Sequence, residues 1–325
     1  MNPVLQAQRV VKTFGATRAV DDLDLEVAPG TTCGFIGPSG AGKTTTIRLI
    51  MSILFPDSGS LSVLGQDSAL KAKDRIGYLP EERGVYRQMK VDAFLLYLAG
   101  LKGVAPDVAA TRAKRLLAQL GLENIGAKKC EDLSKGMLQR VQFVGSIINE
   151  PELLILDEPF GGLDPVSVRA LKGLIVDERR RGATILFSTH VMAQAEELCD
   201  RVVMIHRGRK VLDEPMSTLR RQFDMRRIRF EPLNPHADLQ LLRELSCVAS
   251  VAPEGEACEV TLTPGTAPEV GMRAISEAVA PARIELVRRR LEDVFVELVA
   301  KDGDGDSGHA LKTHLQGLSG EGVTP

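Results

Sequence analysis

The first part of the chain alternates between segments with the periodicity of strands and segments with the periodicity of helices. Residues 20–27 (VDDLDLEV) alternate apolar and acidic positions, which is the pattern of a half-exposed strand. Short apolar runs predict buried strands at 32–36, 153–156 and 184–187, and helical patterns lie at 44–54, 91–148 and 165–181. Because strands that alternate with helices favour parallel pairing, we expect an α/β fold with a mainly parallel sheet and a helical insertion at about 86–150.

The pattern changes after about residue 223. Strand-like segments there are 225–231, 247–251, 258–262 and 284–287, and helix-like segments are 237–245, 270–279 and 291–299. The order βαββαβ, followed by a helix, predicts a small α+β domain of the ferredoxin-like type. We therefore expect a first domain at 1–222, a second at 223–300, and a disordered tail rich in Gly, Asp and Ser at 301–325.

Composition and charge exclude several classes of protein. The chain has 325 residues, of which 44% are hydrophobic and 26% charged, which is typical of a globular protein with two domains. Its net charge of −2 lacks the basic excess of proteins that bind nucleic acid, so no nucleic-acid partner is expected. Its five cysteines form no CxxC pair, which favours a reducing cytosol. The longest apolar stretch, 93–101, is far shorter than the roughly 20 residues that cross a bilayer, so a transport role requires a separate membrane-spanning partner.

Residues 37–44 (GPSGAGKT) match the phosphate-binding pattern GxxxxGK[ST], between a predicted strand and a predicted helix. Glycines in such a loop let backbone N–H groups approach phosphate oxygens at a helix N-terminus. Lys43 is expected to reach the β- and γ-phosphates, and the hydroxyl of Thr44 to bind Mg²⁺. The predicted nucleotide-binding residues are Gly37, Pro38, Ser39, Gly40, Ala41, Gly42, Lys43, Thr44 and Thr45. By itself this motif predicts nucleotide binding without separating an ATPase from a GTPase or a kinase.

The apolar run at 153–156 leads directly into two carboxylates, Asp157 and Glu158. A buried strand that ends in acidic residues delivers them to the crevice where open α/β sheets bind their ligands. Asp157 is expected to hold Mg²⁺, and Glu158 to act as the general base that polarises the attacking water. Without the phosphate loop upstream, the same pattern also fits a strand that ends in a helix cap.

Four further segments lie in the order that one family of ATPases shows. They are 14–15 (FG), 133–140 (LSKGMLQR), 161–165 (GGLDP) and 188–190 (STH). Over about residues 4–220 the chain therefore resembles the ABC ATPases, whose signature is LSGGQ. The resemblance implies an ABC cassette of the phosphate-loop NTPase fold, with a mainly parallel core sheet, an antiparallel edge and a helical insertion. It also implies ATP and Mg²⁺ as cofactors.

The resemblance assigns roles to residues outside the phosphate loop. Phe14 looks like the aromatic residue that stacks on adenine, and His190 looks like the switch histidine that faces the γ-phosphate. Ser134 and Gly136 keep the hydroxyl and the glycine of the signature, where a helix N-terminus forms a second anion site. In the family this second site caps the ATP of another cassette, so the resemblance implies a head-to-tail dimer. Asp164, in the segment similar to the family's D-loop, is expected at the nucleotide sites of that dimer.

Three positions depart from the family pattern. Lys135 stands where the first of two glycines is usual, and Met137 replaces the usual glutamine of the signature. Glu81, in the segment GYLPEERG, stands where the Q-loop glutamine follows a proline. A carboxylate there would still bind Mg²⁺, but it adds negative charge near the γ-phosphate and would slow hydrolysis, so Glu81 is predicted as a catalytic and metal-binding residue. Together with LEDVF at 291–295, these segments resemble a branch of bacterial exporter ATPases related to sodium- and drug-efflux systems.

The combined pattern predicts the ATP-hydrolysing subunit of an exporter, located in the cytoplasm on the inner face of the plasma membrane. Its expected partners are an integral membrane permease and a second ATP-binding subunit. Two alternatives stay open. One is a soluble ABC protein that acts on DNA or the ribosome, although such proteins generally carry two cassettes or a long coiled-coil insertion. The other is a module that uses ATP as a dimerisation switch and hydrolyses it poorly, which Glu81 allows.

Overall fold

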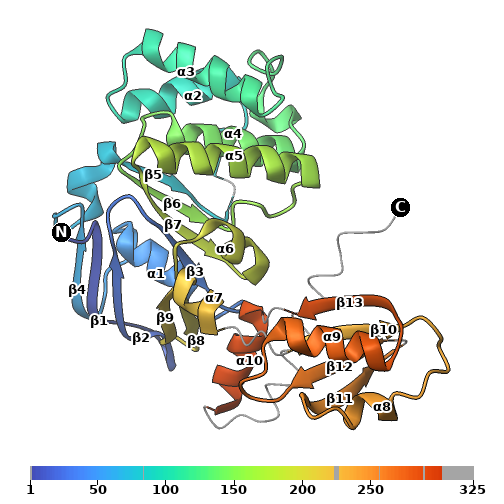
Figure 1. Ribbon diagram of the computed structural model, residues 1–325. Helices are drawn as coiled ribbons and strands as arrows, with labels where there is room; N and C mark the ends of the chain where they lie inside the picture. The colour runs from blue at the N-terminus through green and yellow to red at the C-terminus, as the bar shows by residue number, and fades with distance from the viewer. Residues whose placement is uncertain (1, 83, 223–226, 256, 288–289, 302–325) are drawn as a thin grey trace. The chain divides into compact units, whose positions relative to one another are not determined.

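The computed structural model describes residues 2–82, 84–222, 227–255, 257–287 and 290–301. The chain forms two compact units, Met1–Ser217 with Leu298–Pro325, and Thr218–Glu297 (Figure 1). The predicted disordered tail lies outside the described residues except for Lys301, which ends the last helix. Among the described helices, none is both long and apolar enough to cross a membrane.

A six-stranded mixed sheet forms the centre of the first unit. In spatial order its strands are β5 (Ile76–Leu79), β6 (Leu153–Asp157), β7 (Thr184–Thr189), β3 (Thr32–Ile36), β8 (Arg201–His206) and β9 (Arg209–Pro215). All neighbours pair in parallel except β8 and β9, which are antiparallel. The residues of β3, β6 and β7 are all buried, as expected for parallel strands covered on both faces. The prediction of a mainly parallel core with an antiparallel edge is confirmed.

A three-stranded antiparallel sheet adds to the same core. Its strands, in spatial order, are β2 (Thr17–Val27), β1 (Leu5–Phe14) and β4 (Ser58–Val63). Along β2 the apolar residues Leu23, Leu25 and Val27 are buried while the acidic residues between them are exposed. This alternation is the one that the sequence shows, and it seals one face of the sheet against the first helix, α1 (Lys43–Ile50).

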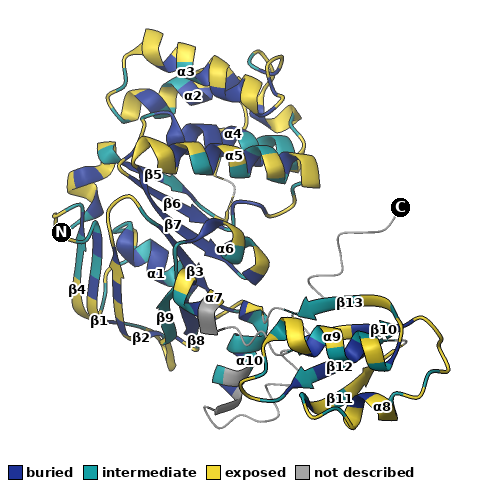
Figure 2. Cartoon of the chain, viewed as in Figure 1, coloured by how far each residue is buried: buried dark blue, intermediate teal, exposed yellow. Residues whose placement is uncertain are grey.

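Most described helices of the first unit lie between β5 and β7 in the sequence. These are α2 (Val91–Leu101), α3 (Pro106–Gln119), η2 (Cys130–Asp132), α4 (Lys135–Ile147) and α5 (Pro165–Arg181). The helix η1 (Ala69–Arg75) precedes β5, α6 (Met192–Leu198) follows β7, and α7 (Met216–Gln222) begins at the end of this unit. Figure 1 shows α2 and α3 on one side of α4 and α5 on the other. Because α4 is enclosed in this way, its residues from Val141 to Ile147 are all buried (Figure 2).

The helix after the phosphate loop ends earlier than the sequence pattern predicts. The expected segment was 44–54, whereas α1 ends at Ile50. Ser52 adopts a left-handed conformation with φ of 55°, which a helix cannot continue through. The N–H groups of Ile53 and Leu54 then both donate to the carbonyl oxygen of Arg48, and these bonds close the helix end.

The second unit contains a four-stranded sheet with short helices. In chain order its elements are β10 (Arg227–Pro232), α8 (Gln240–Arg243), β11 (Val248–Glu254), β12 (Ala257–Leu262), α9 (Pro268–Ala278), β13 (Pro281–Val287) and α10 (Leu291–Lys301). The spatial order is β11-β12-β10-β13, and every neighbouring pair is antiparallel. Phe230, Cys258 and Val260 of the sheet pack with Ile275 of α9 in a buried core.

The first helix of the second unit is shorter than predicted. The expected helix covered 237–245, but α8 is a single turn of four residues. The side chain of Asn234 accepts a hydrogen bond from the N–H of His236, and that of Asp238 accepts one from the N–H of Gln240. Such side chains offer the backbone an alternative to helical hydrogen bonds, so the segment begins as turns.

Candidate functional site

The phosphate loop, residues 37–42, connects β3 to α1 and is packed closely against two neighbouring strands. A Cβ atom at Gly37 would come within 2.3 Å of the carbonyl oxygen of Ile205, and one at Gly42 within 2.3 Å of that of Ala19. Gly42 also has a φ of 105°, a conformation that other residues rarely take. The geometry therefore requires both glycines. The loop leaves the first N–H groups of α1 without carbonyl partners in the helix, as an anion site needs.

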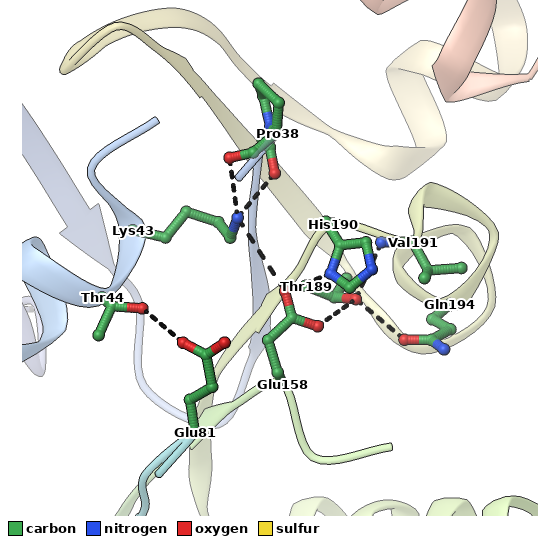
Figure 3. A network of polar contacts seen from close by, with 10 residues as sticks. Pro38, Lys43, Thr44, Glu81, Glu158, Thr189, His190, Val191 and Gln194 are labelled. Atoms are coloured by element: carbon green, nitrogen blue, oxygen red, sulfur yellow. Dashed lines mark hydrogen bonds and ion pairs between the residues drawn. The ribbon is translucent and has the colours of Figure 1, made fainter. Parts of the chain in front are cut away.

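Lys43 lies in the first turn of α1 and is only 7% exposed. Its Nζ donates hydrogen bonds to the carbonyl oxygens of Gly37 at 2.7 Å and Pro38 at 3.1 Å, and lies 4.0 Å from Oε1 of Glu158 (Figure 3). Burial lowers the pKa of Lys43, while three nearby carboxylates oppose this effect. The ammonium is thus held beside the loop, where a phosphate group would stabilise its charged form.

A pocket of about 440 Å³ opens in front of the phosphate loop, a volume within the usual range for ligand sites. Its lining consists of Thr17, Arg18, Ala19, Ser39, Gly40, Gly42, Lys43, Thr44, Thr45, Glu81, Glu158, His190, Arg207 and Gly208. The fold therefore brings the phosphate loop together with Glu81, Glu158 and His190, which are far apart in the sequence.

Asp157 ends β6 with a carboxylate that is completely buried. Burial raises its pKa, although the neighbouring hydroxyls of Ser188 and Thr44 act in the opposite direction. Among the described residues, neither of its carboxylate oxygens has a hydrogen-bond partner of normal geometry. A buried carboxylate in this condition is costly unless a cation compensates its charge. Because Mg²⁺ prefers oxygen ligands, Asp157 beside the hydroxyl of Thr44 fits such an ion.

Within the part of the chain that the structure describes, no group of three or more His, Cys, Asp or Glu side chains is arranged to hold a metal. A Mg²⁺ ion at Asp157 would therefore depend on hydroxyl, phosphate and water oxygens for most of its ligands. This dependence is usual for Mg²⁺ that accompanies a nucleotide.

Glu158 follows β6 and points toward His190 (Figure 3). Its Oε1 lies 2.8 Å from Nδ1 of His190, and its Oε2 accepts a hydrogen bond from the hydroxyl of Thr189 at 3.3 Å. The hydrogen bond to Glu158 raises the pKa of His190. Glu158 has a φ of 51°, and its N–H donates to the carbonyl oxygen of Ser188, so the surrounding backbone holds a conformation that is strained for a glutamate.

Glu81 lies in the loop after β5 and enters the same pocket. Its Oε2 accepts a hydrogen bond from the hydroxyl of Thr44 at 3.2 Å (Figure 3). The next residue, Glu82, forms an ion pair of 2.8 Å with Arg48 of α1. The loop is thus connected to α1 at two points. A carboxylate consequently stands next to Thr44, where the resemblance to ABC ATPases leads one to expect an amide.

Several predicted site residues lie outside the pocket lining. In the phosphate loop and at the end of β6 these are Gly37, Pro38, Ala41 and Asp157, and in the signature and the D-loop segment they are Ser134, Gly136 and Asp164. Ser134 is the N-cap of α4 and accepts a 3.3 Å hydrogen bond from the first turn of that helix. Asp164 is the N-cap of α5 and accepts three hydrogen bonds from its first turn. Gly136 faces the segment before α5, since a Cβ atom there would lie 3.5 Å from the side chain of Leu163. The signature and the D-loop segment are therefore neighbours that do not complete the pocket of their own chain.

Phe14 also lies outside the pocket lining. It ends β1 with 48% of its surface exposed, and Nζ of Lys12 lies 5.6 Å from the centre of its ring. In the β1–β2 register it pairs with Thr17, which does line the pocket. Its stacking on adenine stays a prediction.

Five lining residues belong to no motif and are not predicted by the sequence: Thr17, Arg18, Ala19, Arg207 and Gly208. The first three begin β2, and the last two form the turn between β8 and β9. The glycine is the one signal in the sequence, and it indicates a turn rather than a ligand contact.

A mixed α/β sheet with a strand–loop–helix phosphate loop and an acidic strand end is typical of phosphate-loop nucleoside triphosphatases. Residues 20–161 match the family described as ABC transporter. The chain is 35% identical to the ABC transporter ATP-binding protein YhaQ of Bacillus subtilis, over 91% of this chain and 98% of that relative. It therefore belongs to the family of ABC transporter ATP-binding proteins.

Two further comparisons agree with this membership. The Nod factor export ATP-binding protein I of Cupriavidus metallidurans is 37% identical, over 66% of this chain and 71% of the relative. A solved ATP-binding subunit of an ABC transporter is 32% identical and superposes with a TM-score of 0.63, over 67% of this chain and 92% of that structure. The predictions of an ABC fold, of ATP binding and of ATPase activity are thereby confirmed. Such subunits work with membrane permease partners.

Proposed function

We propose that the chain binds ATP with Mg²⁺ in the pocket before the phosphate loop, hydrolyses it, and drives export through a separate membrane-spanning partner. The observation that carries this proposal is the convergence of Lys43, Glu158 and His190 on one pocket. A general base must lie within reach of the water that it activates. A carboxylate 4.0 Å from the ammonium that binds phosphate meets this condition.

In this proposal Glu158 is the general base that accepts a proton from the attacking water. Lys43 exchanges the carbonyl oxygens of the loop for the β- and γ-phosphates and stabilises the charge that develops on them. His190 is held by Glu158 at 2.8 Å, and its raised pKa favours an imidazolium that faces the γ-phosphate. All three side chains are partly or fully buried, where electrostatic interactions are stronger than in bulk water.

Thr44, Asp157 and Glu81 are the residues that we expect to hold Mg²⁺. When bound, the ion neutralises the negative charge of the phosphates. The buried carboxylate of Asp157, whose oxygens have no hydrogen-bond partner of normal geometry among the described residues, supports this assignment. The oxygens of Thr44 and Glu81 lie 3.2 Å apart, close enough to bind one cation together.

The signature residues fit a role in a second subunit. Ser134 and Gly136 lie at the start of α4, outside the lining of the pocket in their own chain. We infer a head-to-tail dimer in which they cap the ATP bound to the other subunit, with Asp164 beside them. The N-terminus of α4 supplies N–H groups and a positive dipole end for the phosphates.

The direction of transport is inferred from a relative. The Nod factor export ATP-binding protein I carries an export function in its name and is 37% identical to this chain. Together with the segments YLPEERG and LSKGM, this similarity supports an exporter. An exporter motor of this kind works in the cytoplasm, on the inner face of the membrane that holds its permease.

We also propose that the second unit is a ferredoxin-like domain, with a boundary near residue 222. Its spatial strand order, β11-β12-β10-β13, places the first strand between the third and the fourth. Helices α8 and α9 connect the first strand to the second and the third to the fourth. This arrangement agrees with the split βαβ pattern of that fold.

Steady-state ATP hydrolysis by the purified chain tests the assignment of the base. Glu158→Gln should lower the turnover rate about 10²- to 10⁴-fold, because the base is removed. Affinity for ATP should stay nearly the same, because the phosphate loop is intact. Glu82→Gln is the control, since it makes the same change of charge on an exposed neighbour of the site and should keep wild-type turnover. A wild-type rate no greater than that of Glu158→Gln would contradict a motor and support an ATP-dependent dimerisation switch.

A further inference from the structure

Helix α4 contains two glutamine side chains that are buried and have no role in the proposed function. Gln139 is 2% exposed and Gln142 is 6% exposed. A buried amide is costly unless it is hydrogen-bonded, so its partner is informative. Nε2 of Gln139 donates to the carbonyl oxygen of Pro159 at 3.2 Å, whereas Oε1 of Gln142 has no hydrogen-bond partner among the described residues. Gln139 therefore connects α4 to the segment that follows the acidic end of β6.

This segment, residues 158–163, leads from β6 to α5 and is built from turns. The carbonyl oxygens of Glu158 and Phe160 each accept a 3.2 Å hydrogen bond from the N–H group three residues later. The carbonyl oxygen of Pro159 lies between these two in the sequence and accepts from the side chain of Gln139. The hydrogen bond from α4 thus acts on the residue directly after Glu158.

The backbone of Glu158 depends on its surroundings, because its φ of 51° is strained for a glutamate. On one side, its N–H donates to the carbonyl oxygen of Ser188 in β7 at 3.0 Å. On the other side, the ring of Pro159 fixes the φ angle of that proline, and Gln139 holds its carbonyl oxygen. The two hydrogen bonds together leave the backbone at Glu158 little freedom to relax.

The face of α4 that carries Gln139 also carries the signature glycine. Gly136 and Gln139 are three positions apart, so they lie on the same side of the helix. A Cβ atom at Gly136 would lie 3.5 Å from the side chain of Leu163 and 3.6 Å from the carbonyl oxygen of Gly162. This face of α4 therefore runs along segment 158–163, beside α5 (Figure 1).

We propose that Gln139 is a positioning residue for ATP hydrolysis. By holding the carbonyl oxygen of Pro159, it keeps the carboxylate of Glu158 where it can accept a proton from the attacking water. Gln139 does not line the pocket, so it acts through Glu158 and not on the nucleotide. Its effect on the rate is large because a displacement of about 1 Å in a reacting group can cost roughly 10²-fold. This inference rests on the proposed function, in which Glu158 is the general base.

Steady-state ATP hydrolysis by Gln139→Met and Gln139→Leu tests this role in the full chain. Both replacements keep a buried side chain of similar size but remove the N–H donor. Each should lower kcat about ten- to a hundredfold. The KM for ATP should change by less than about twofold, because the phosphate loop is intact. Gln142→Met is the matched control: it makes the same replacement on the same helix, at a side chain without the bond to Pro159, and should keep the wild-type kcat.

A double variant separates positioning from a general loss of structure. In the Glu158→Gln background, Gln139→Met should lower the residual rate by less than about twofold, because the base that it positions is absent. An equal loss in both backgrounds, a loss in only one of the Gln139 variants, or an equal loss in Gln142→Met would overturn the proposal. If Glu158→Gln itself keeps wild-type turnover, the proposed function fails. If Glu158→Gln is slow while both Gln139 variants match the wild type, the positioning role alone is wrong.

Discussion

At the scale of single residues, one neighbour has the largest effect on the pKa of His190. The hydrogen bond between its Nδ1 and Glu158 is the largest cause of its raised pKa, while burial and the charge of Lys43 act in the opposite direction. His190 therefore keeps its proton to a higher pH than a free imidazole does. The charged interaction is fully present below the ordinary pKa of histidine and is lost as the pH rises through the raised value. A protonated imidazole at this place adds attraction for phosphate.

Replacing the carboxylate of Glu158 tests this dependence directly. Glu158→Gln should lower the pKa of His190 toward its ordinary value, because the amide can still form a hydrogen bond but carries no charge. An NMR titration of the imidazole resonances in the nucleotide-free chain measures the shift. Glu81→Gln is the comparison: Glu81 is the weakest of the causes that act on His190, so its removal should lower the pKa much less. Equal shifts in the two variants would contradict the assignment of Glu158 as the dominant partner.

Residues whose role follows from a local motif could be predicted, and those placed by strand pairing could not. Glu158 follows the buried strand β6 directly, and Lys43 follows the buried strand β3 after the phosphate loop, so the parallel sheet brings both to one edge. Arg18 and Arg207 meet the same pocket because of hydrogen bonds between β2, the loop and the β8–β9 turn. Nothing in the local sequence of either arginine encodes those bonds. Phe14 illustrates the reverse case, since it matches a motif but lies outside the lining.

At the scale of elements, the predicted bounds match the structure where a fully buried apolar run or clear capping residues mark the ends of the element. The strand at 32–36 and the helix at 165–181 were predicted with the observed bounds. The strand is buried at every residue, and the helix has Asp164 as its N-cap, a proline in its first turn and Gly182 in the left-handed conformation at its end. Helix α1 and α8 were predicted too long because left-handed Ser52 and the turn-forming side chain of Asp238 interrupt them, which hydrophobic periodicity does not reveal.

The N-cap of α5 gives a prediction at this scale. Asp164→Ala should lower the melting temperature by about 2–4 °C near neutral pH, because three hydrogen bonds to the first turn are lost. Asp164→Asn should retain most of the stability, since asparagine also caps helices. Thermal denaturation followed by circular dichroism measures these differences.

The pH dependence of that effect distinguishes a charged cap from a merely polar one. Hydrogen bonds from Ser167 lower the pKa of Asp164, so its contribution is present above the ordinary carboxyl pKa and is lost as the pH falls through the lowered value. The gap between wild type and Asp164→Ala should therefore shrink on acidification. A gap of the same size in neutral and strongly acidic solution would show that the carboxylate charge does not contribute.

At the scale of the whole molecule, the chain is an ABC cassette followed by a small antiparallel domain. The cassette contains one phosphate-loop pocket, and its signature begins α4 outside that pocket. In the proposed head-to-tail dimer, a second subunit related by twofold symmetry joins the phosphate loop of one chain to the signature of the other. This proposal can be tested without knowledge of the transported substrate.

Mixing two inactive variants tests the head-to-tail dimer. Lys43→Ala disables the phosphate loop, and Gly136→Arg obstructs the signature, where a side chain would meet the segment before α5. Neither variant alone can form an intact site, whereas a mixed dimer contains one intact site made of the good loop and the good signature. An equal mixture should recover up to about a quarter of the wild-type ATPase rate, since half of randomly formed dimers are mixed and each has one of two sites. The control is Lys43→Ala mixed with the double variant, which forms no intact site. Recovery in the control, or none in the test mixture despite dimer formation, would contradict the assignment of Ser134 and Gly136 to the site of the other subunit.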